Sequence, residues 1–309
     1  MYKRMLVPLD GSELAELVFG YAKELAGRLD LDLILLHVSG SSEHDLPPIH
    51  RAYIEQAAEI LRRQSAEVQE KTRSKPGGKA LEARGELAVG NAAEEILRYA
   101  DENDIDLILI ATHGRSGVKR WAMGSVADKV LRASKVPVWL VRAGIPEEIV
   151  HDKWPRRTIL VPLDGSKLAE SVLPHVETLA KQRGTELVDV VLLQVCVPPT
   201  ILIGYEDMSL IPVNTEKLLR QELEQMQKRS ERYLARVKKQ LNKPGLRVRS
   251  EILVGRPIDE IIDYANRNPF NLIVLSTHGR SGITRWAYGQ LADKVIQRST
   301  SPIFLVRPH

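Results

Sequence analysis

A glycine-rich stretch that could hold an anion occurs twice in the chain. Residues 111–130, ATHGRSGVKRWAMGSVADKV, return at residues 276–295 as STHGRSGITRWAYGQLADKV, and fourteen of the twenty positions are identical. Gly114 and Gly117 permit positive φ and let main-chain N–H groups approach a ligand, and a cluster of such groups binds anions. Ser125 opens a helix, whose N-terminus carries unpaired donors and partial positive charge. We therefore expect a phosphate in this stretch.

A second repeated motif places an acid after the first strand. MLVPLDGS at residues 5–12 recurs as ILVPLDGS at residues 159–166. Ligands of open parallel sheets bind beyond the carboxyl ends of the strands, so both repeated motifs face one crevice if their strands are neighbours. Asp10 suits hydrogen bonds to ribose hydroxyls. The two motifs together predict a nucleotide with its sugar near Asp10 and its phosphates between Gly114 and Ser125.

Each of these residues also has a purely structural interpretation. Asp10 could cap the first helix, Ser125 with Asp128 could form a capping pair, and His113 and His278 could be hydrogen-bonded turn residues. The recurrence of both motifs in the same order favours a site. The sequence contains no P-loop, no G-x-S-x-G elbow, no HExxH and no paired-cysteine metal pattern. We therefore assign no catalytic residue and no protein metal site.

Length and composition indicate a cytoplasmic protein of two ordinary domains. The chain has 309 residues, 43% hydrophobic and 27% charged. Its net charge of +4 is spread along the sequence, so neither nucleic acid nor a membrane surface is an expected partner. Cys196 is the single cysteine, which excludes an internal disulfide and fits a reducing compartment. The N-terminal residues show no signal-peptide core, and no apolar run reaches the roughly 18 residues that span a bilayer.

The repeats indicate a tandem duplication, whose two units we call the first and the second copy. The offset between matching motifs grows from 154 at the first strand to 165 at VGNAAEEI and VGRPIDEI, so the second copy carries an insertion, chiefly within residues 198–221. Its role as a lid, a partner surface or a solvated loop stays open. We place the first domain at residues 1–143, a charged linker at 144–156 and the second domain at 157–309.

Short apolar runs alternate with helical patterns, which predicts an α/β fold with a parallel sheet. RMLVPL, DLILLHV, DLILIAT and VPVWLV are nearly continuous aliphatic runs, as expected of strands covered on both faces. ALEARGELA alternates more and should lie nearer an edge. Asn91, followed by Glu94, predicts a helix N-terminus. Long helices are expected at residues 53–71 and at about 216–241.

These motifs resemble the universal stress protein family in its tandem two-domain form. The family pattern G-x2-G-x9-G-[S/T] is similar to Gly114, nine residues and Gly124-Ser125 in the first copy, and to Gly279, nine residues and Gly289-Gln290 in the second. The resemblance implies two doubly wound domains of the adenine-nucleotide alpha-hydrolase-like (HUP) kind, each with a five-stranded parallel sheet of order 3-2-1-4-5. The first and fourth strands are then neighbours.

The resemblance also implies ATP or ADP in this crevice, with Mg2+ carried on the phosphates. The residues that it assigns to the nucleotide in the first copy are Pro8, Asp10, Val38, Ala111, Thr112, His113, Gly114, Arg115, Ser116, Gly117, Gly124, Ser125 and Val126. Their equivalents in the second copy are Pro162, Asp164, Val195, Ser276, His278, Gly279, Arg280, Gly282, Gly289 and Gln290.

The two copies depart from the family pattern to different degrees. Ala111 and Ser276 both replace its first glycine. Gln290 replaces the short Ser or Thr where a terminal phosphate would lie, which adds bulk and removes a hydroxyl. We therefore predict a nucleotide in the first copy and weak or absent binding in the second. A stress-response or regulatory role is the leading hypothesis; a slow ATPase and a scaffold with degenerate pockets are the alternatives.

The resemblance further implies pairing through the fifth strands. VPVWLVR at residues 136–142 and SPIFLVR at residues 301–307 are apolar edges, and an unpaired apolar edge is a liability. Within one chain the two copies would form a pseudo-dimer. A homodimer of chains is compatible with this arrangement.

Overall fold

The computed structural model describes residues 1–12, 18–40, 48–72, 80–112, 123–142, 157–198, 213–268, 272–277 and 289–308. Its strands are β1 (Arg4–Leu9), β2 (Asp32–Ser39), β3 (Ala83–Val89), β4 (Leu107–Ala111), β5 (Val138–Val141), β6 (Arg157–Pro162), β7 (Val188–Cys196), β8 (Arg247–Val254), β9 (Leu272–Ser276) and β10 (Ile303–Val306). Its helices are α2 (Val18–Leu29), α3 (Pro48–Thr72), α4 (Ala92–Glu102), α5 (Ser125–Ala133), α7 (Lys167–Glu170), α8 (Leu173–Arg183), the 3-10 turn η1 (Thr185–Leu187), α10 (Val213–Gln240), α11 (Pro257–Arg267) and α12 (Gln290–Arg298).

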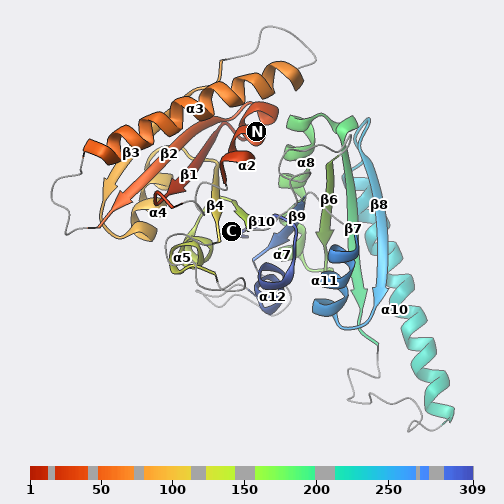
Figure 1. The fold of residues 1–309 in the computed structure, drawn as a ribbon. Helices are drawn as coiled ribbons and strands as arrows, with labels where there is room; N and C mark the ends of the chain where they lie inside the picture. The colour runs from red at the N-terminus through yellow and green to blue at the C-terminus, as the bar shows by residue number, and fades with distance from the viewer. Residues whose placement is uncertain are drawn as a thin grey trace.

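The described strands form one sheet that runs through both copies (Figure 1). The strand order is β3-β2-β1-β4-β5-β10-β9-β6-β7-β8, so each copy has the expected order 3-2-1-4-5. Neighbouring strands are parallel within a copy. The exception is the junction of the copies, where β5 and β10 are antiparallel and Phe304 lies opposite Trp139. The more alternating β3 lies at an edge of the sheet, as its sequence predicts.

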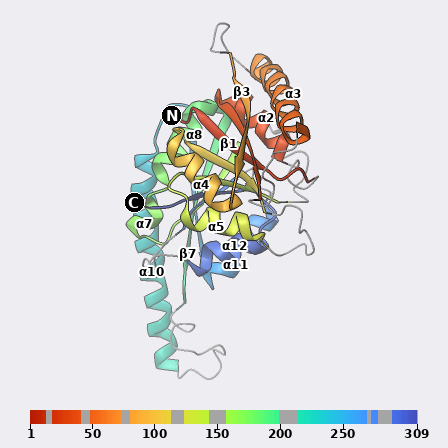
Figure 2. The same ribbon diagram turned by 90° about the vertical axis from the view of Figure 1, so that its left-hand side faces the viewer.

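Helices cover both faces of the sheet, as Figures 1 and 2 show. The continuous apolar strands supply side chains to both faces: Met5 and Val7 of β1 join one hydrophobic cluster, and Leu6 joins the other. Helices α2, α3, α8 and α10 contribute to the first cluster. Helices α4, α5, α11 and α12 contribute to the second. Each cluster contains residues of both copies, so the core is shared along the whole sheet.

The two copies pack closely where their fifth strands meet. The rings of Trp139 and Phe304 lie edge to face, 5.7 Å apart, and both side chains are buried. Tyr2 of the first copy contacts His175 of α8, with 2.6 Å between the tyrosine oxygen and Nδ1. Burial, aided by the negative charge of Asp106, raises the pKa of Tyr2 above its ordinary value. These contacts fix the position of one copy against the other.

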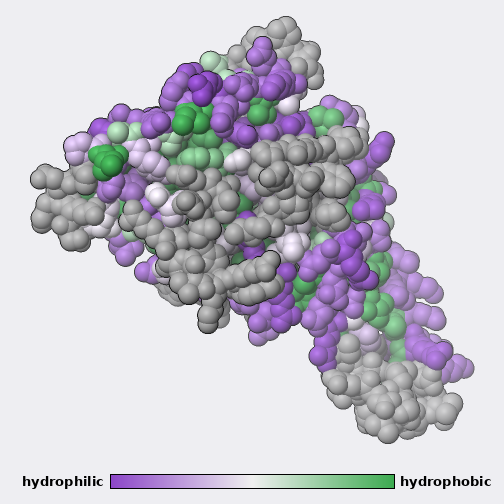
Figure 3. Space-filling view, in the orientation of Figure 1, coloured by the Kyte–Doolittle hydropathy of each residue, from purple (hydrophilic) through white to green (hydrophobic). Residues whose placement is uncertain are grey.

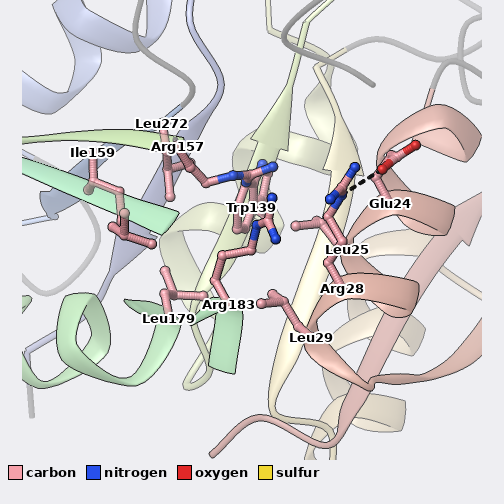
Figure 4. A pocket seen from close by; sticks show the side chains of 11 residues that line it. Glu24, Leu25, Arg28, Leu29, Trp139, Arg157, Ile159, Leu179, Arg183 and Leu272 are labelled. Carbon is pink, nitrogen blue, oxygen red and sulfur yellow. Dashed lines mark hydrogen bonds and ion pairs between the residues drawn. The ribbon is translucent and has the colours of Figure 1, made fainter. Parts of the chain in front are cut away.

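A small pocket lies at this junction, and both copies line it (Figure 4). Its first-copy side is formed by α2 and β5, where Arg28 donates to Glu24 at 2.8 Å. On the second-copy side, the guanidinium of Arg157 lies 5.7 Å from the centre of the Trp139 ring, a cation–π distance. The pocket is therefore rich in arginine and belongs to the packing between the copies.

Polar side chains predominate on the described surface in view in Figure 3, and the second copy carries the longer helix, α10. On the coloured part of the face shown in Figure 3, hydrophilic side chains predominate and are interrupted by hydrophobic areas. The expected helices at 53–71 and 216–241 are observed as α3 and α10, each starting a few residues earlier. In Figure 1 the N-terminal part of α10 extends beyond the sheet. Within the described ranges, every helix is too short or too polar to cross a membrane.

Candidate functional site

The strand pairing brings the two repeated motifs to the same edge of the sheet. Leu9 of β1 pairs with His37 of β2, so Asp10 lies level with Val38. On its other side β1 pairs with β4 in a register that places Leu9 level with Ala111. The carboxyl ends of β1, β2 and β4 thus meet there, as the sequence predicts for neighbouring first and fourth strands.

Asp10 shapes a tight turn at this edge. Its Oδ1 accepts hydrogen bonds from the Ser12 N–H at 3.0 Å and from the Ser12 hydroxyl at 2.6 Å. Gly11 between them has φ of 74°, which a side chain would make costly. The second copy repeats this turn, with Asp164 accepting from the Ser166 N–H at 2.9 Å. Both carboxylates are thus held in place beside the ends of the first strands.

The helix cap in the second copy is the serine and not the aspartate. Ser166 accepts a hydrogen bond from the Ala169 N–H at 3.1 Å and opens α7. Asp164, the second-copy counterpart of Asp10, is therefore not the N-cap of its helix. The corresponding residues after Ser12 in the first copy lie outside the described residues.

The glycine-rich stretch is closed at its base by backbone hydrogen bonds. The Gly124 N–H donates to the Thr112 carbonyl oxygen at 2.7 Å, and in the second copy the Gly289 N–H donates to Thr277 at 2.8 Å. Thr112 is itself tied to β5, because its N–H donates to the Val141 carbonyl oxygen at 2.9 Å. Each following helix therefore starts at a fixed place next to the end of the fourth strand.

Among the residues that the structure describes, no side chain caps the N-terminus of α5. Gly124 occupies the N-cap position and Ser125 is the first helical residue. The capping-pair interpretation of Ser125 and Asp128 is therefore wrong; Asp128 instead accepts from Arg132 at 2.8 Å. A helix without a side-chain cap presents its first N–H groups and the positive end of its dipole to a ligand. The same holds for α12, whose N-cap is Gly289.

The central part of the predicted site falls in the two glycine-rich stretches. His113, Gly114, Arg115, Ser116 and Gly117 lie outside the described residues, and so do the second-copy residues His278, Gly279, Arg280 and Gly282. Their assignment to the nucleotide stays a prediction. The structure places the flanking predicted residues Pro8, Asp10, Val38, Ala111, Thr112, Gly124, Ser125 and Val126 along the carboxyl edge of β1, β2 and β4.

The two copies differ within this shared geometry. Ser125 and Gln290 both occupy the first position of their helices, and both are exposed. The first copy therefore has a short hydroxyl side chain, and the second copy a longer amide side chain, at the same backbone position. The prolines before the acids also differ, since Pro8 is half-buried and Pro162 is buried. The remaining second-copy equivalents Asp164, Val195 and Ser276 are half-buried at the corresponding strand ends.

A histidine cluster lies beside the first-copy edge and was not predicted as part of the site. His37 is buried, and its Nδ1 lies 3.0 Å from the carbonyl oxygen of Leu9, the residue before Asp10. Its ring meets that of His50 edge to face at 4.7 Å, and Nδ1 of His50 lies 3.3 Å from the hydroxyl of Ser39. The cluster joins the end of β2 to α3 and to the turn at Asp10.

The sequence contains one signal for this cluster. The motif LLHV of the first copy reads LLQV in the second, so Gln194 replaces His37. Oε1 of Gln194 is buried and has no hydrogen-bond partner among the residues that the structure describes. The polar contact at the strand end is thus specific to the first copy. Within the same described ranges, no group of three His, Cys, Asp or Glu side chains is placed to hold a metal ion.

Comparisons with a family model and with curated proteins point to the same family. The model of the universal stress protein family matches residues 1–142 and again residues 155–307. The universal stress protein YxiE of Bacillus subtilis is 30% identical over 148 residues, which are 46% of this chain and all of that protein. The universal stress protein MJ0531 of Methanocaldococcus jannaschii is 27% identical over 142 residues, 46% of this chain and 83% of the relative.

Solved structures match the fold over nearly the full length. A universal stress protein from Archaeoglobus fulgidus superimposes with a TM-score of 0.61 at 22% identity, covering 98% of each chain. A putative universal stress protein from Pseudomonas aeruginosa gives a TM-score of 0.67 at 16% identity, covering 99% of this chain and 94% of the other. At these identities the likeness concerns the fold, and it extends across both copies.

Proposed function

The chain belongs to the universal stress protein family, and we propose that its first copy binds ATP or ADP at the carboxyl edge of β1, β2 and β4 in a regulatory, stress-related role. The observation that carries the proposal is the start of α5, which has a glycine as N-cap, no side-chain cap from the described residues, and a place at the edge where Asp10 is held in its turn. This arrangement offers donors to phosphates and a carboxylate to a sugar at one edge of the sheet.

The chemistry of each part suits a nucleotide. The amides that begin α5, together with the predicted loop amides at Gly114 and Gly117, supply hydrogen bonds and positive potential for the phosphates. Asp10 accepts hydrogen bonds from ribose hydroxyls, and the main chain at Val38 borders the adenine. Mg2+, when bound with the nucleotide, neutralises phosphate charge. In this proposal the protein holds the phosphate oxygens and not the metal.

We further propose that the second copy binds nucleotide weakly or not at all. Its helix α12 presents the longer Gln290 at the position where α5 presents Ser125, and Pro162 at the rim is buried. The division into a first domain at 1–143, a linker at 144–156 and a second domain at 157–309 belongs to the same proposal, as does pairing of the copies as a pseudo-dimer. The antiparallel contact of β5 with β10 supports that pairing.

Calorimetric titration of the full chain with ATP·Mg2+ tests the nucleotide site. Asp10→Asn keeps the acceptor that forms the turn with Ser12 but removes the negative charge, so affinity should fall by about tenfold. Asp164→Asn makes the same change in the same turn of the second copy and should leave the affinity at its wild-type value. Absence of heat from the wild type, or equal affinity of wild type and Asp10→Asn, would contradict the proposal.

A further inference from the structure

Two arginines cross from one copy to the other at the junction of the sheet. Arg142 directly follows β5, and Arg307 directly follows β10. Nη1 of Arg307 donates to the carbonyl oxygen of Arg132 in the last turn of α5, at 3.1 Å. Nη1 of Arg142 donates to the carbonyl oxygens that end α12, at 3.3 Å for Ile296, 3.0 Å for Gln297 and 2.6 Å for Ser299. The two arginines therefore make reciprocal contacts.

These contacts are well suited to holding the ends of helices. The last carbonyl groups of a helix have no partner within the helix, and a cation near them also complements the negative end of the helix dipole. Burial lowers the pKa of the Arg142 guanidinium from its ordinary value, but an arginine remains charged in proteins. Each arginine thus supplies both a hydrogen-bond donor and a full positive charge to a helix of the other copy.

The helices held in this way are the two whose N-termini face the candidate sites. α5 is fixed at its start by its own copy, through Gly124 and Thr112, and at its end by Arg307 of the other copy. α12 is fixed at its start through Gly289 and Thr277, and at its end by Arg142. Neither helix is positioned by its own copy alone.

Backbone hydrogen bonds also connect each arginine to the glycine-rich stretch of its own copy. The Thr112 N–H donates to Val141, the residue before Arg142, and the Thr277 N–H donates at 2.8 Å to Val306, the residue before Arg307. Each arginine is therefore anchored next to the base of its own glycine-rich stretch and reaches the helix of the other. A displacement of Thr112 or Thr277 can therefore reach the helix of the other copy through these hydrogen bonds and the adjoining arginine.

We propose that Arg307 is a positioning residue for the nucleotide site of the first copy, and that Arg142 has the same role for α12 of the second. Each copy thereby completes the other's phosphate-binding helix. The inference deepens the proposed function and rests on it, because α5 is the helix that would hold the phosphates. Its geometric part, the cross-positioning of the two helices, can also be measured without any nucleotide.

The affinity test compares Arg307→Met with Lys135→Met in calorimetric titrations of the full chain with ATP·Mg2+. Lys135 lies just beyond α5, is exposed and pairs with Asp101, so its replacement removes the same charge near the same helix end without touching the carbonyl groups. Arg307→Met should weaken binding by about fivefold or more, the usual scale of coupling between sites. Lys135→Met should bind as the wild type does. Wild-type affinity in Arg307→Met, or an equal loss in both variants, would overturn the proposal.

Hydrogen exchange of the nucleotide-free chain provides the second readout, read by mass spectrometry for the amides of α5 and α12. Arg307→Met should speed exchange in α5 and leave α12 unchanged, whereas Arg142→Met should do the reverse. Equal acceleration of both helices, as general destabilisation would give, or acceleration in the arginine's own copy, would overturn the proposal. If the wild type bound no nucleotide, the proposed function would fail, and this crossed pattern would still decide the role of the arginines.

Discussion

At the residue scale, the first helical position after the glycine-rich stretch distinguishes the two copies. Ser125 and Gln290 share the same backbone setting, with a glycine N-cap before each and exposure to solvent. A serine leaves room for a phosphate and can donate its hydroxyl. A glutamine extends further and has an amide end that must be moved aside. The difference in binding that we propose is therefore attributed chiefly to this side chain, which each copy presents at the same backbone position.

Exchanging these two residues should exchange the binding behaviour. Gln290→Ser should raise the nucleotide affinity of the second copy by about tenfold, a free-energy change near 1.4 kcal/mol, because it restores space and a hydroxyl donor. Ser125→Gln should lower the affinity of the first copy by a similar factor. Both effects can be read in titrations of the full chain. Unchanged affinity in both variants would show that the position does not control binding.

At the scale of elements, the sequence predicts strands and helices better than their contacts. The apolar runs predict the strands of the first copy, and Asn91 is confirmed as the N-cap of α4, its side chain accepting from the Glu94 N–H at 3.4 Å. The contact of His37 with Leu9 could not be predicted, because it depends on the register of β1 against β2, which the expected strand order does not give. The pairing of the fifth strands was expected, but that expectation does not say which helix end each of the following arginines reaches.

The cap of α4 gives a prediction for this element. Asn91→Ala should lower the free energy of unfolding by about 1 kcal/mol, since the first-turn N–H of Glu94 loses its side-chain acceptor. Asn91→Ser should keep most of the stability, because serine caps helices about as well. Denaturant unfolding of both variants measures the difference. Equal stability of Asn91→Ala and the wild type would show that the cap contributes nothing at this helix.

At the scale of the whole molecule, the two copies share one sheet and two hydrophobic clusters. The rings of Tyr2, Trp139, His175 and Phe304 connect the copies on one face. A ligand that binds only the folded state stabilises the whole unit that unfolds together with its site. The free energy of unfolding rises by about 2.7 kcal/mol when the free ligand concentration is a hundred times Kd. A nucleotide in the first copy is therefore expected to stabilise the second copy as well.

Unfolding should accordingly be a single transition that includes both copies. Phe304→Ala removes a fully buried ring at the junction and should cost about 3–5 kcal/mol. Phe19→Ala, at a half-buried position on α2, should cost clearly less. Denaturant unfolding followed by fluorescence and by circular dichroism tests this. Two separate transitions in the wild type would mean that the shared core does not couple the copies.

The number of nucleotides carried by one chain tests the central claim most directly. Native mass spectrometry of the chain with ATP·Mg2+ near the Kd of the first copy should show at most one added nucleotide per chain, with lower occupancy in Asp10→Asn than in the wild type at the same ATP concentration. A chain that carried no nucleotide would contradict the proposed site. A chain that carried two would contradict the proposed difference between Ser125 and Gln290.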